Sequence, residues 1–448
     1  MNALLAILAF AISIGIALFV PGHGATAVIL CAVLAVLTGF FVRQVQIDRD
    51  FLSKLFVIGL LLRMLVGTLI FTLNLQEFFG GDANTYDNLG YQLLSTWQGN
   101  KIYLANIEIF SAGGGWGMLY IVAAVYSIVG RNPLAVQFVN AIIGVATVPL
   151  VYLCAHQMFR NRRVARIAAL FVTFYPSLVL WSAQGLKDAP IVLLLVLTMY
   201  ATLRLGEKLN VKFFLVLILS LFGVLSLRFY IFYMVVGAVA GALTIGMRRT
   251  NVQSLTQQAV LLMGIGLAMT YFGVLSTASV QLERFGSLES IQQSRSDMAR
   301  TATSGFGKDV DVSTTTGALK AIPLGMVNLL FAPFPWQLAN LRQSITLPEM
   351  IVWWASFPLL VLGLWFTIKH QLRQALPILL FTMMLTLSYS VFQGNVGTAY
   401  RQRSQLLVFY FIFVAVGFVL FKEKRENERA MRVRQLTSAP ARPVSRNI

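Results

Sequence analysis

Apolar runs of about 18 or more residues recur along the whole chain, with short polar segments between them. Each such run can cross a hydrocarbon core of about 30 Å. In lipid it must be helical, because no water is available to satisfy the backbone. The pattern therefore predicts an all-α polytopic membrane protein with about twelve transmembrane helices. We expect the spans at residues 3–20, 24–43, 51–73, 133–157, 164–183, 188–205, 212–227, 229–247, 255–275, 346–368, 374–391 and 403–421.

The first apolar run, 3–20, superficially resembles a signal peptide. However, no Lys or Arg precedes it, and it is longer than the usual apolar core of about 7–15 residues. We interpret it as a retained first span, with a cleaved signal as the alternative.

Basic residues gather in short segments between the spans, which predicts their orientation. In the twelve-span arrangement the clusters all fall on one side, and cytoplasmic loops carry an excess of Lys and Arg. We therefore expect an inner-membrane protein with both termini in the cytoplasm. The clusters are Arg43–Arg49, Arg160–Arg166, Arg204–Lys212, Arg248–Arg249, Lys369–Arg373 and Lys422–Arg434.

The apolar stretch 116–129 is too short to be a thirteenth span, since 14 residues rise only about 21 Å as a helix. Counting it would also move every later basic cluster to the other side. We expect a helix against the outer membrane surface.

Two long segments then face outwards, 74–132 and 276–345. The second contains Pro333-Phe334-Pro335-Trp336, which cannot continue a regular helix and suggests a surface-anchored or re-entrant element. The predicted organisation is two N-terminal helices in 1–50, a transmembrane module in 51–275 with the first outer loop at 74–132, the second outer loop at 276–345, C-terminal helices in 346–421 and a basic cytoplasmic tail in 422–448.

Composition agrees with this class, since 57% of the residues are hydrophobic and only 12% are charged. Soluble proteins carry roughly a quarter charged residues. The net charge of +18 is explained by the orientation rule rather than by nucleic-acid binding. Cys31 and Cys154 fall inside apolar runs, and the three histidines have no metal-ligand spacing, so neither a disulfide framework nor a tetrahedral zinc site is predicted.

The most informative polar residues lie in the loop Gly81-Asp82-Ala83-Asn84-Thr85-Tyr86. Asp82 and Tyr86 are four residues apart, so on a helix they share a face, and the following residues have the spacing of a short amphipathic helix. A plain N-capping role explains a lone Asp here. The functional alternative is favoured by a second acidic position on the same side, Lys187-Asp188, although Asp188 could also cap the next helix.

Three of the basic residues on the outer face, Arg228, Arg401 and Arg403, lie at or beside the ends of predicted spans. Arginine forks suit phosphate oxygens, and the alternative is snorkelling to lipid head groups. Carboxylates, Tyr and Arg at the outer surface suit the transfer of a group from a lipid phosphate. In such a reaction an aspartate can deprotonate an acceptor hydroxyl, and arginines or a metal can stabilise the leaving phosphate.

The order of these motifs resembles the GT-C superfamily of membrane glycosyltransferases, in the bacterial branch related to protein O-mannosyltransferases and aminoarabinose transferases. The resemblance comprises Asp-x-x-x-Tyr at Asp82–Tyr86, the surface helix near 117–129, and the stretch 133–205 with its basic loop at 159–166 and with Asp188 opening a span. It covers about 130 residues well.

The resemblance implies a polyprenyl-phosphate-linked sugar donor, inversion at the anomeric carbon, and a glycan, lipid or protein acceptor on the outer side. Asp82 corresponds to the catalytic base and Asp188 to a second acidic position, with Tyr86, Lys187 and Arg228 as substrate-binding candidates. Arg401 and Arg403 are candidates for the donor phosphate by position alone. Some members bind a divalent metal near these carboxylates, so a divalent metal is the one cofactor candidate; the residues by themselves indicate none.

Two other functions compete with this interpretation. An O-antigen polymerase or ligase also has about twelve spans, outward arginines and a large late outer loop. A lipid-linked-sugar flippase or other transporter would instead carry charges along a central cavity. Charges within the predicted spans are scarce, with Arg63 the clearest, and this favours chemistry at the surface.

Overall fold

The structure is a computed structural model that describes residues 3–112, 115–245, 252–271, 287–338 and 340–437. Over these residues helices joined by turns and loops make up the chain, with one isolated β-bridge, between Gly305 and Asn395. The helices are α1 (Ala3–Phe19), α2 (Gly24–Arg43), α3 (Arg49–Thr72), α4 (Gln76–Phe79), α5 (Asp82–Trp97), η1 (Lys101–Tyr103), α6 (Leu104–Ala112), α7 (Gly117–Val129), α8 (Pro133–Phe159), α9 (Arg162–Phe174), α10 (Pro176–Ser182), α11 (Asp188–Glu207), α12 (Val211–Leu227), α13 (Phe229–Ile245), α14 (Val252–Tyr271), α16 (Leu288–Thr301), α17 (Thr315–Phe331), α18 (Leu341–His370), α19 (Leu372–Phe392) and α20 (Val396–Thr437).

Each of the twelve predicted spans coincides with a helix or a helix pair, which confirms a polytopic helical membrane protein. In the described part, seven helices are long and apolar enough to cross a membrane, or eight if the bent pair α9–α10 is one span. The other predicted spans correspond to α14 and to α1, α12 and α13, each of 17 residues, at the short end of what can span. The end of the predicted span 255–275, the Arg248–Arg249 cluster and the start of the second loop lie outside the described residues.

The predicted span 164–183 is present as a helix pair rather than a continuous helix. It bends by 56° between α9 and α10. Pro176 has no backbone N–H and cannot continue the hydrogen-bond ladder of α9. The bend directs α10 and its Trp181 toward the end of the bundle where α5 begins, which we call the Asp82 end.

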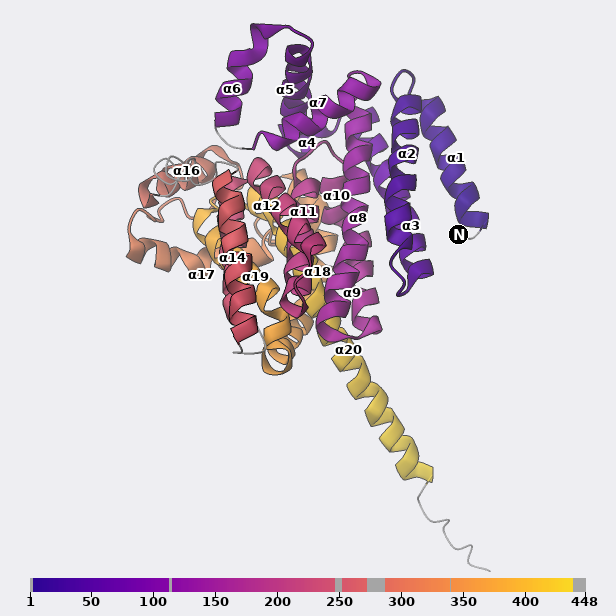
Figure 1. The fold of residues 1–448 in the computed structure, drawn as a ribbon, viewed down its shortest axis with the longest axis vertical. Helices are drawn as coiled ribbons and strands as arrows, with labels where there is room; N and C mark the ends of the chain where they lie inside the picture. Colours follow the sequence, from indigo (N-terminus) through magenta and orange to yellow (C-terminus); the bar gives the residue numbers. More distant parts are fainter. Residues whose placement is uncertain (1–2, 113–114, 246–251, 272–286, 339, 438–448) are drawn as a thin grey trace, which may run out of the picture.

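The last helix, α20, runs through the middle of the bundle and then projects beyond it (Figure 1). Every residue from Arg403 to Gly417 is buried. Its close approach to α18 requires glycine, since a Cβ at Gly363 would lie 1.9 Å from the carbonyl oxygen of Phe413. A Cβ at Gly417 would lie 2.0 Å from that of Leu359. Small residues commonly allow such close backbone contact between membrane helices.

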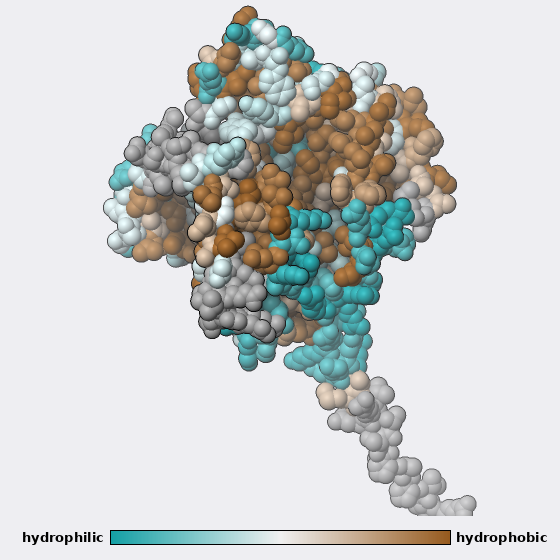
Figure 2. Space-filling model, viewed as in Figure 1, coloured by the Kyte–Doolittle hydropathy of each residue, from teal (hydrophilic) through white to brown (hydrophobic). Residues whose placement is uncertain are grey.

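Ion pairs hold several basic segments together at the end of the bundle opposite Asp82. Arg160 pairs with Glu207 at 2.7 Å, Arg166 with Asp48 at 2.5 Å, and Arg163 with Glu426 at 3.7 Å. These contacts join the start of α3, the ends of α8 and α11, the first turns of α9 and the α20 extension. Figure 2 shows hydrophilic side chains toward this end and apolar ones around the middle of the molecule.

The predicted first loop forms the α-helices α4 to α7 and the short helix η1, and the α-helices gather at the Asp82 end (Figure 1). Helix α5 is amphipathic, as expected, and buries Ala83, Tyr86, Gly90 and Leu93 on one face. It packs directly on α7, where a Cβ at Gly90 would lie 2.4 Å from Val122 Cγ1. In the second loop, α17 ends at Phe331, before the Pro-Phe-Pro-Trp segment, as the prolines predicted.

Candidate functional site

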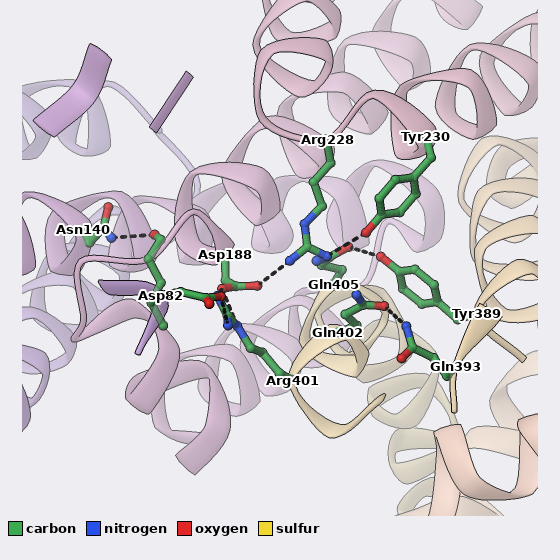
Figure 3. Close-up of polar contacts among 11 residues, drawn as sticks. Asp82, Asn140, Asp188, Arg228, Tyr230, Tyr389, Gln393, Arg401, Gln402 and Gln405 are labelled. Atoms are coloured by element: carbon green, nitrogen blue, oxygen red, sulfur yellow. Dashed lines mark hydrogen bonds and ion pairs between the residues drawn. The ribbon is translucent and has the colours of Figure 1, made fainter. Parts of the chain in front are cut away.

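Arg401 joins the two predicted catalytic carboxylates. Its Nη1 donates to Asp82 Oδ2 at 2.6 Å, and its Nε and Nη2 donate to Asp188 Oδ2 at 2.8 and 2.6 Å. Figure 3 shows Arg401 reaching both carboxylates. Asp82 and Asp188 are in the first turns of α5 and α11, and Arg401 is in the second turn of α20. Three residues singled out from the sequence therefore form one cluster.

Neither aspartate acts as the helix cap that was the simpler explanation. The N-cap residues are Gly81 for α5 and Lys187 for α11, and neither makes a side-chain capping bond. Asp82 and Asp188 are instead the first helical residues, and both carboxylates pair with Arg401. Negative charge is favoured in this position by the helix dipole.

Arg228 binds the second oxygen of Asp188. Its Nη2 lies 3.3 Å from Asp188 Oδ1, and its Nη1 donates to Tyr230 Oη at 3.1 Å. Arg228 lies in the turn between α12 and α13. Asp188 is only 1% exposed, and its pairing with two guanidinium groups explains how a carboxylate is tolerated there.

Lys187 adds a third cation beside this cluster, and its ammonium group lies over the ring of Tyr86. The Lys187 Nζ lies 5.9 Å from the centroid of the Tyr86 ring. Burial, followed by the nearby Arg228, lowers the pKa of Lys187 to about 8. Tyr86 itself is buried and stacks edge-on against Phe110, so it holds Lys187 rather than facing the cavity described next.

A cavity of about 1020 Å³ lies beside the cluster and is lined by Asp82, Lys187, Arg228 and Arg401. Apolar side chains of α3, α9 and α10, among them Leu62 and Phe174, form another part of its wall. The cavity thus combines a polar corner with an apolar wall, as expected for a site that takes a lipid-linked polar group.

The second loop closes part of this cavity with residues 301–304, Pro333 and Asn340. Two backbone hydrogen bonds hold it there, from Phe306 N to Gly394 O at 2.8 Å and from Val396 N to Ser304 O at 3.0 Å. In addition, Arg342 donates to the carbonyl oxygen of Glu77 at 3.3 Å and so links the second loop to the first.

Arg403 lies away from the cluster. Its Nη1 donates to Leu330 O at 2.8 Å and its Nη2 lies 3.1 Å from Met350 Sδ, and it is not among the residues that line the cavity. Side chains two positions apart on a helix point about 200° apart around its axis. Arg401 and Arg403 therefore face nearly opposite directions. A structural role explains Arg403 better than donor binding.

Several polar residues at the site were not predicted from the sequence. Tyr230 extends the cluster toward a network in which Tyr389 Oη donates to Gln405 Oε1 at 2.7 Å and Gln393 contacts Gln402 (Figure 3). Glu349 lies on the cavity wall. It occurs just inside a predicted span, and an ionisable residue at that depth is a signal that should have identified it.

The carboxylates do not fit a divalent metal as they are arranged. Arg401 pairs with both Asp82 and Asp188, and Arg228 pairs with the other oxygen of Asp188. Across the described ranges, no three His, Cys, Asp or Glu side chains gather in a way that could hold a metal ion.

Residues 116–273 match the family described as dolichyl-phosphate-mannose-protein mannosyltransferase. The match covers about a third of the chain and includes Lys187, Asp188 and Arg228, whereas Asp82 and Arg401 lie outside it. No curated protein matches the chain significantly. The family match supports the predicted resemblance to GT-C-type glycosyltransferases.

Proposed function

The family match indicates a membrane glycosyltransferase of the mannosyltransferase type, and from this premise we propose a donor, an acceptor side and a mechanism. The chain transfers a sugar from a polyprenyl-phosphate-linked donor to an acceptor on the outer face of the cell inner membrane. The transfer serves the assembly of cell-surface polysaccharide or glycoconjugate.

The observation that carries the proposal is the cluster of Asp82, Asp188 and Arg401 beside a cavity that also has an apolar wall. The apolar part suits a polyprenyl chain, and Lys187, Arg228 and Arg401 suit the phosphate. With both aspartates ionised and the three basic groups protonated, the cluster has one surplus positive charge, which favours an anionic ligand.

In the proposed reaction Asp82 is the general base. It is 53% exposed and can therefore reach an acceptor hydroxyl at the open side of the cavity. Asp82 takes the hydroxyl proton, the acceptor oxygen bonds to the anomeric carbon, and the bond from that carbon to the phosphate oxygen breaks with inversion. The electron pair stays on the phosphate, whose charge Arg401, Arg228 and Lys187 stabilise.

Asp188 positions the arginines in this scheme. It holds Arg401 with one oxygen and Arg228 with the other, which presents both guanidinium groups to the same ligand. A bound phosphate would compete with Asp82 for Arg401 and so release the base once the donor is in place.

A flippase is less well supported by the same observations. The cavity residues Asp82, Lys187 and Arg401 gather near the starts of α5, α11 and α20 rather than along a path through the bundle. This favours chemistry at one membrane surface. No further observation favours a polymerase or ligase over the proposed transferase.

The test uses purified protein in lipid nanodiscs with polyprenyl phosphates that carry mannose, glucose or galactose. We expect Asp82→Asn to lower kcat by about 10²- to 10⁴-fold, the usual contribution of a general base, with donor binding retained. Glu108→Gln, which changes an exposed acid of α6, is the matched control and should be fully active.

Full activity of Asp82→Asn would remove Asp82 as the base. If wild-type protein in vesicles moves the donor across the bilayer and transfers no sugar, the enzyme proposal itself is wrong.

A further inference from the structure

Glu349 is a buried carboxylate on the wall of the same cavity, and the reaction proposed above does not use it. It lies in α18 and is 4% exposed. Its Oε2 accepts a hydrogen bond from Tyr400 Oη at 2.8 Å, while its Oε1 has no hydrogen-bond partner. Among the described residues, no Lys, Arg or His nitrogen lies within ion-pair distance of it.

Burying a carboxyl group lowers the stability of the fold unless another group pairs with it. A buried ionised carboxylate needs a cation or several hydrogen bonds, and ionisable groups inside membrane helices usually mark a functional site. The neighbouring Ser177 also lines the cavity; its hydroxyl and backbone N–H lie close to the Glu349 carboxyl, but its buried Oγ makes no hydrogen bond of normal geometry. We call these two residues the Glu349 corner.

The Glu349 corner lies next to the proposed phosphate site. Tyr400, which binds Glu349, directly precedes Arg401 in α20. Trp181 connects the two, because its ring centroid is 6.3 Å from that of Tyr400 and 5.7 Å from the Arg401 guanidinium carbon. Trp181 and Tyr400 also line the cavity. A group attached to a phosphate at Arg401 would therefore meet an aromatic wall and then an unsatisfied acceptor.

We propose that the Glu349 corner binds a hydroxyl group of the donor sugar and determines which sugar is transferred. Glu349 Oε1 accepts the hydroxyl hydrogen, and Ser177 Oγ completes the pairing. The inference rests on the proposed function and names the subsite for its sugar.

The burial of the two carboxylates assigns this subsite to the donor rather than the acceptor. Asp82 is half exposed at the open side, where an acceptor arrives, whereas Glu349 is enclosed. The donor sugar is bonded to the phosphate and is bound before the acceptor attacks, so it occupies the inner position.

The test compares the donor that the wild-type protein turns over best with its mono-deoxy analogues, one ring position at a time. For one analogue, we expect the wild-type kcat/KM to fall by about 10- to 100-fold, the cost of leaving a buried polar group without its partner. Glu349→Gln should lower kcat/KM for the parent donor by a similar factor and lose the discrimination against that analogue. Glu108→Gln should discriminate as the wild type does.

The inference would be overturned if each deoxy donor lowered kcat/KM by the same factor in the wild type and in Glu349→Gln. It would also be overturned if Glu349→Gln changed the discrimination between deoxy acceptors rather than between deoxy donors. If Glu349→Gln does not fold, Ser177→Ala provides the second measurement, with the same analogue expected to lose its penalty in part. Wild-type protein that transfers no sugar from any donor would instead contradict the proposed function.

Discussion

At the scale of single residues, Lys187 is the proposed phosphate contact whose charge changes near neutral pH. Burial lowers the pKa of Lys187 from its ordinary value of 10.5 to about 8. The ammonium is therefore charged below about pH 8 and loses its charge above it. We therefore expect the KM for the donor to rise roughly tenfold as the pH increases through about 8, because one phosphate contact loses its charge.

Donor KM measured between about pH 6 and pH 10 checks this, with Lys187→Gln expected to lose the pH dependence and Lys101→Gln, an exposed lysine outside the cavity, to retain it. Burial raises the pKa of Tyr86, so this neighbour stays neutral over the range. A pH dependence of the same size in Lys187→Gln would assign the titration elsewhere. The other charged groups that act on Lys187 are Arg228, Asp188, Arg401 and Asp82.

At the scale of helices, Arg63 of α3 compensates for the break between α9 and α10. Pro176 leaves the Val172 carbonyl without its usual partner, and the bend does the same for Thr173. Arg63 donates to both carbonyl oxygens, at 3.3 and 3.1 Å, and to Ser182 Oγ at 2.8 Å. This charge within a predicted span therefore has a structural role, and it fixes the helix that carries Trp181.

We expect Arg63→Met to lower the free energy of unfolding by about 2–6 kcal/mol, since two buried carbonyls lose their donors. In a Pro176→Ala background the same change should cost less by about 1–3 kcal/mol, because residue 176 then has an N–H for Val172. Chemical or thermal unfolding of the four proteins in one detergent measures the coupling. Strictly additive effects would show that Arg63 does not act through the break.

At the scale of the whole molecule, the ion pairs divide the bundle into two ends of different character. Asp188 begins α11 beside Asp82 and Arg401, so the other end of α11, at Glu207, lies with the basic segments. The orientation rule assigns that end to the cytoplasm. We therefore propose that the cavity opens on the outer face and that the tail after Phe421 is cytoplasmic.

Cysteine labelling tests this orientation, because both native cysteines, Cys31 and Cys154, are buried free thiols that should give little background. In intact cells, a membrane-impermeant maleimide should label Lys101→Cys in the first loop and should not label Lys208→Cys until the membrane is opened. Both positions are exposed in the structure. The reverse result would place the site in the cytoplasm and contradict the proposed acceptor side.

The sequence by itself determined the membrane class, the positions of the helices and the candidates Asp82, Asp188 and Arg401. Hydrophobic runs, prolines and charge clusters are local features, and polar residues at the ends of apolar runs are visible without a fold. Sequence position was a poor guide to direction, however. It grouped Arg403 with Arg401, although residues two apart on a helix do not share a face.

Only the tertiary structure decided which of these residues meet. Arg401 contacts Asp82 across 319 positions and Asp188 across 213, a juxtaposition that depends on how α5, α11 and α20 pack. The same packing encloses Glu349 beside Tyr400, holds Arg63 against the break at Pro176, and places the second loop over the cavity. Such contacts arise from the directions of side chains on packed helices, and no local pattern in the chain specifies them.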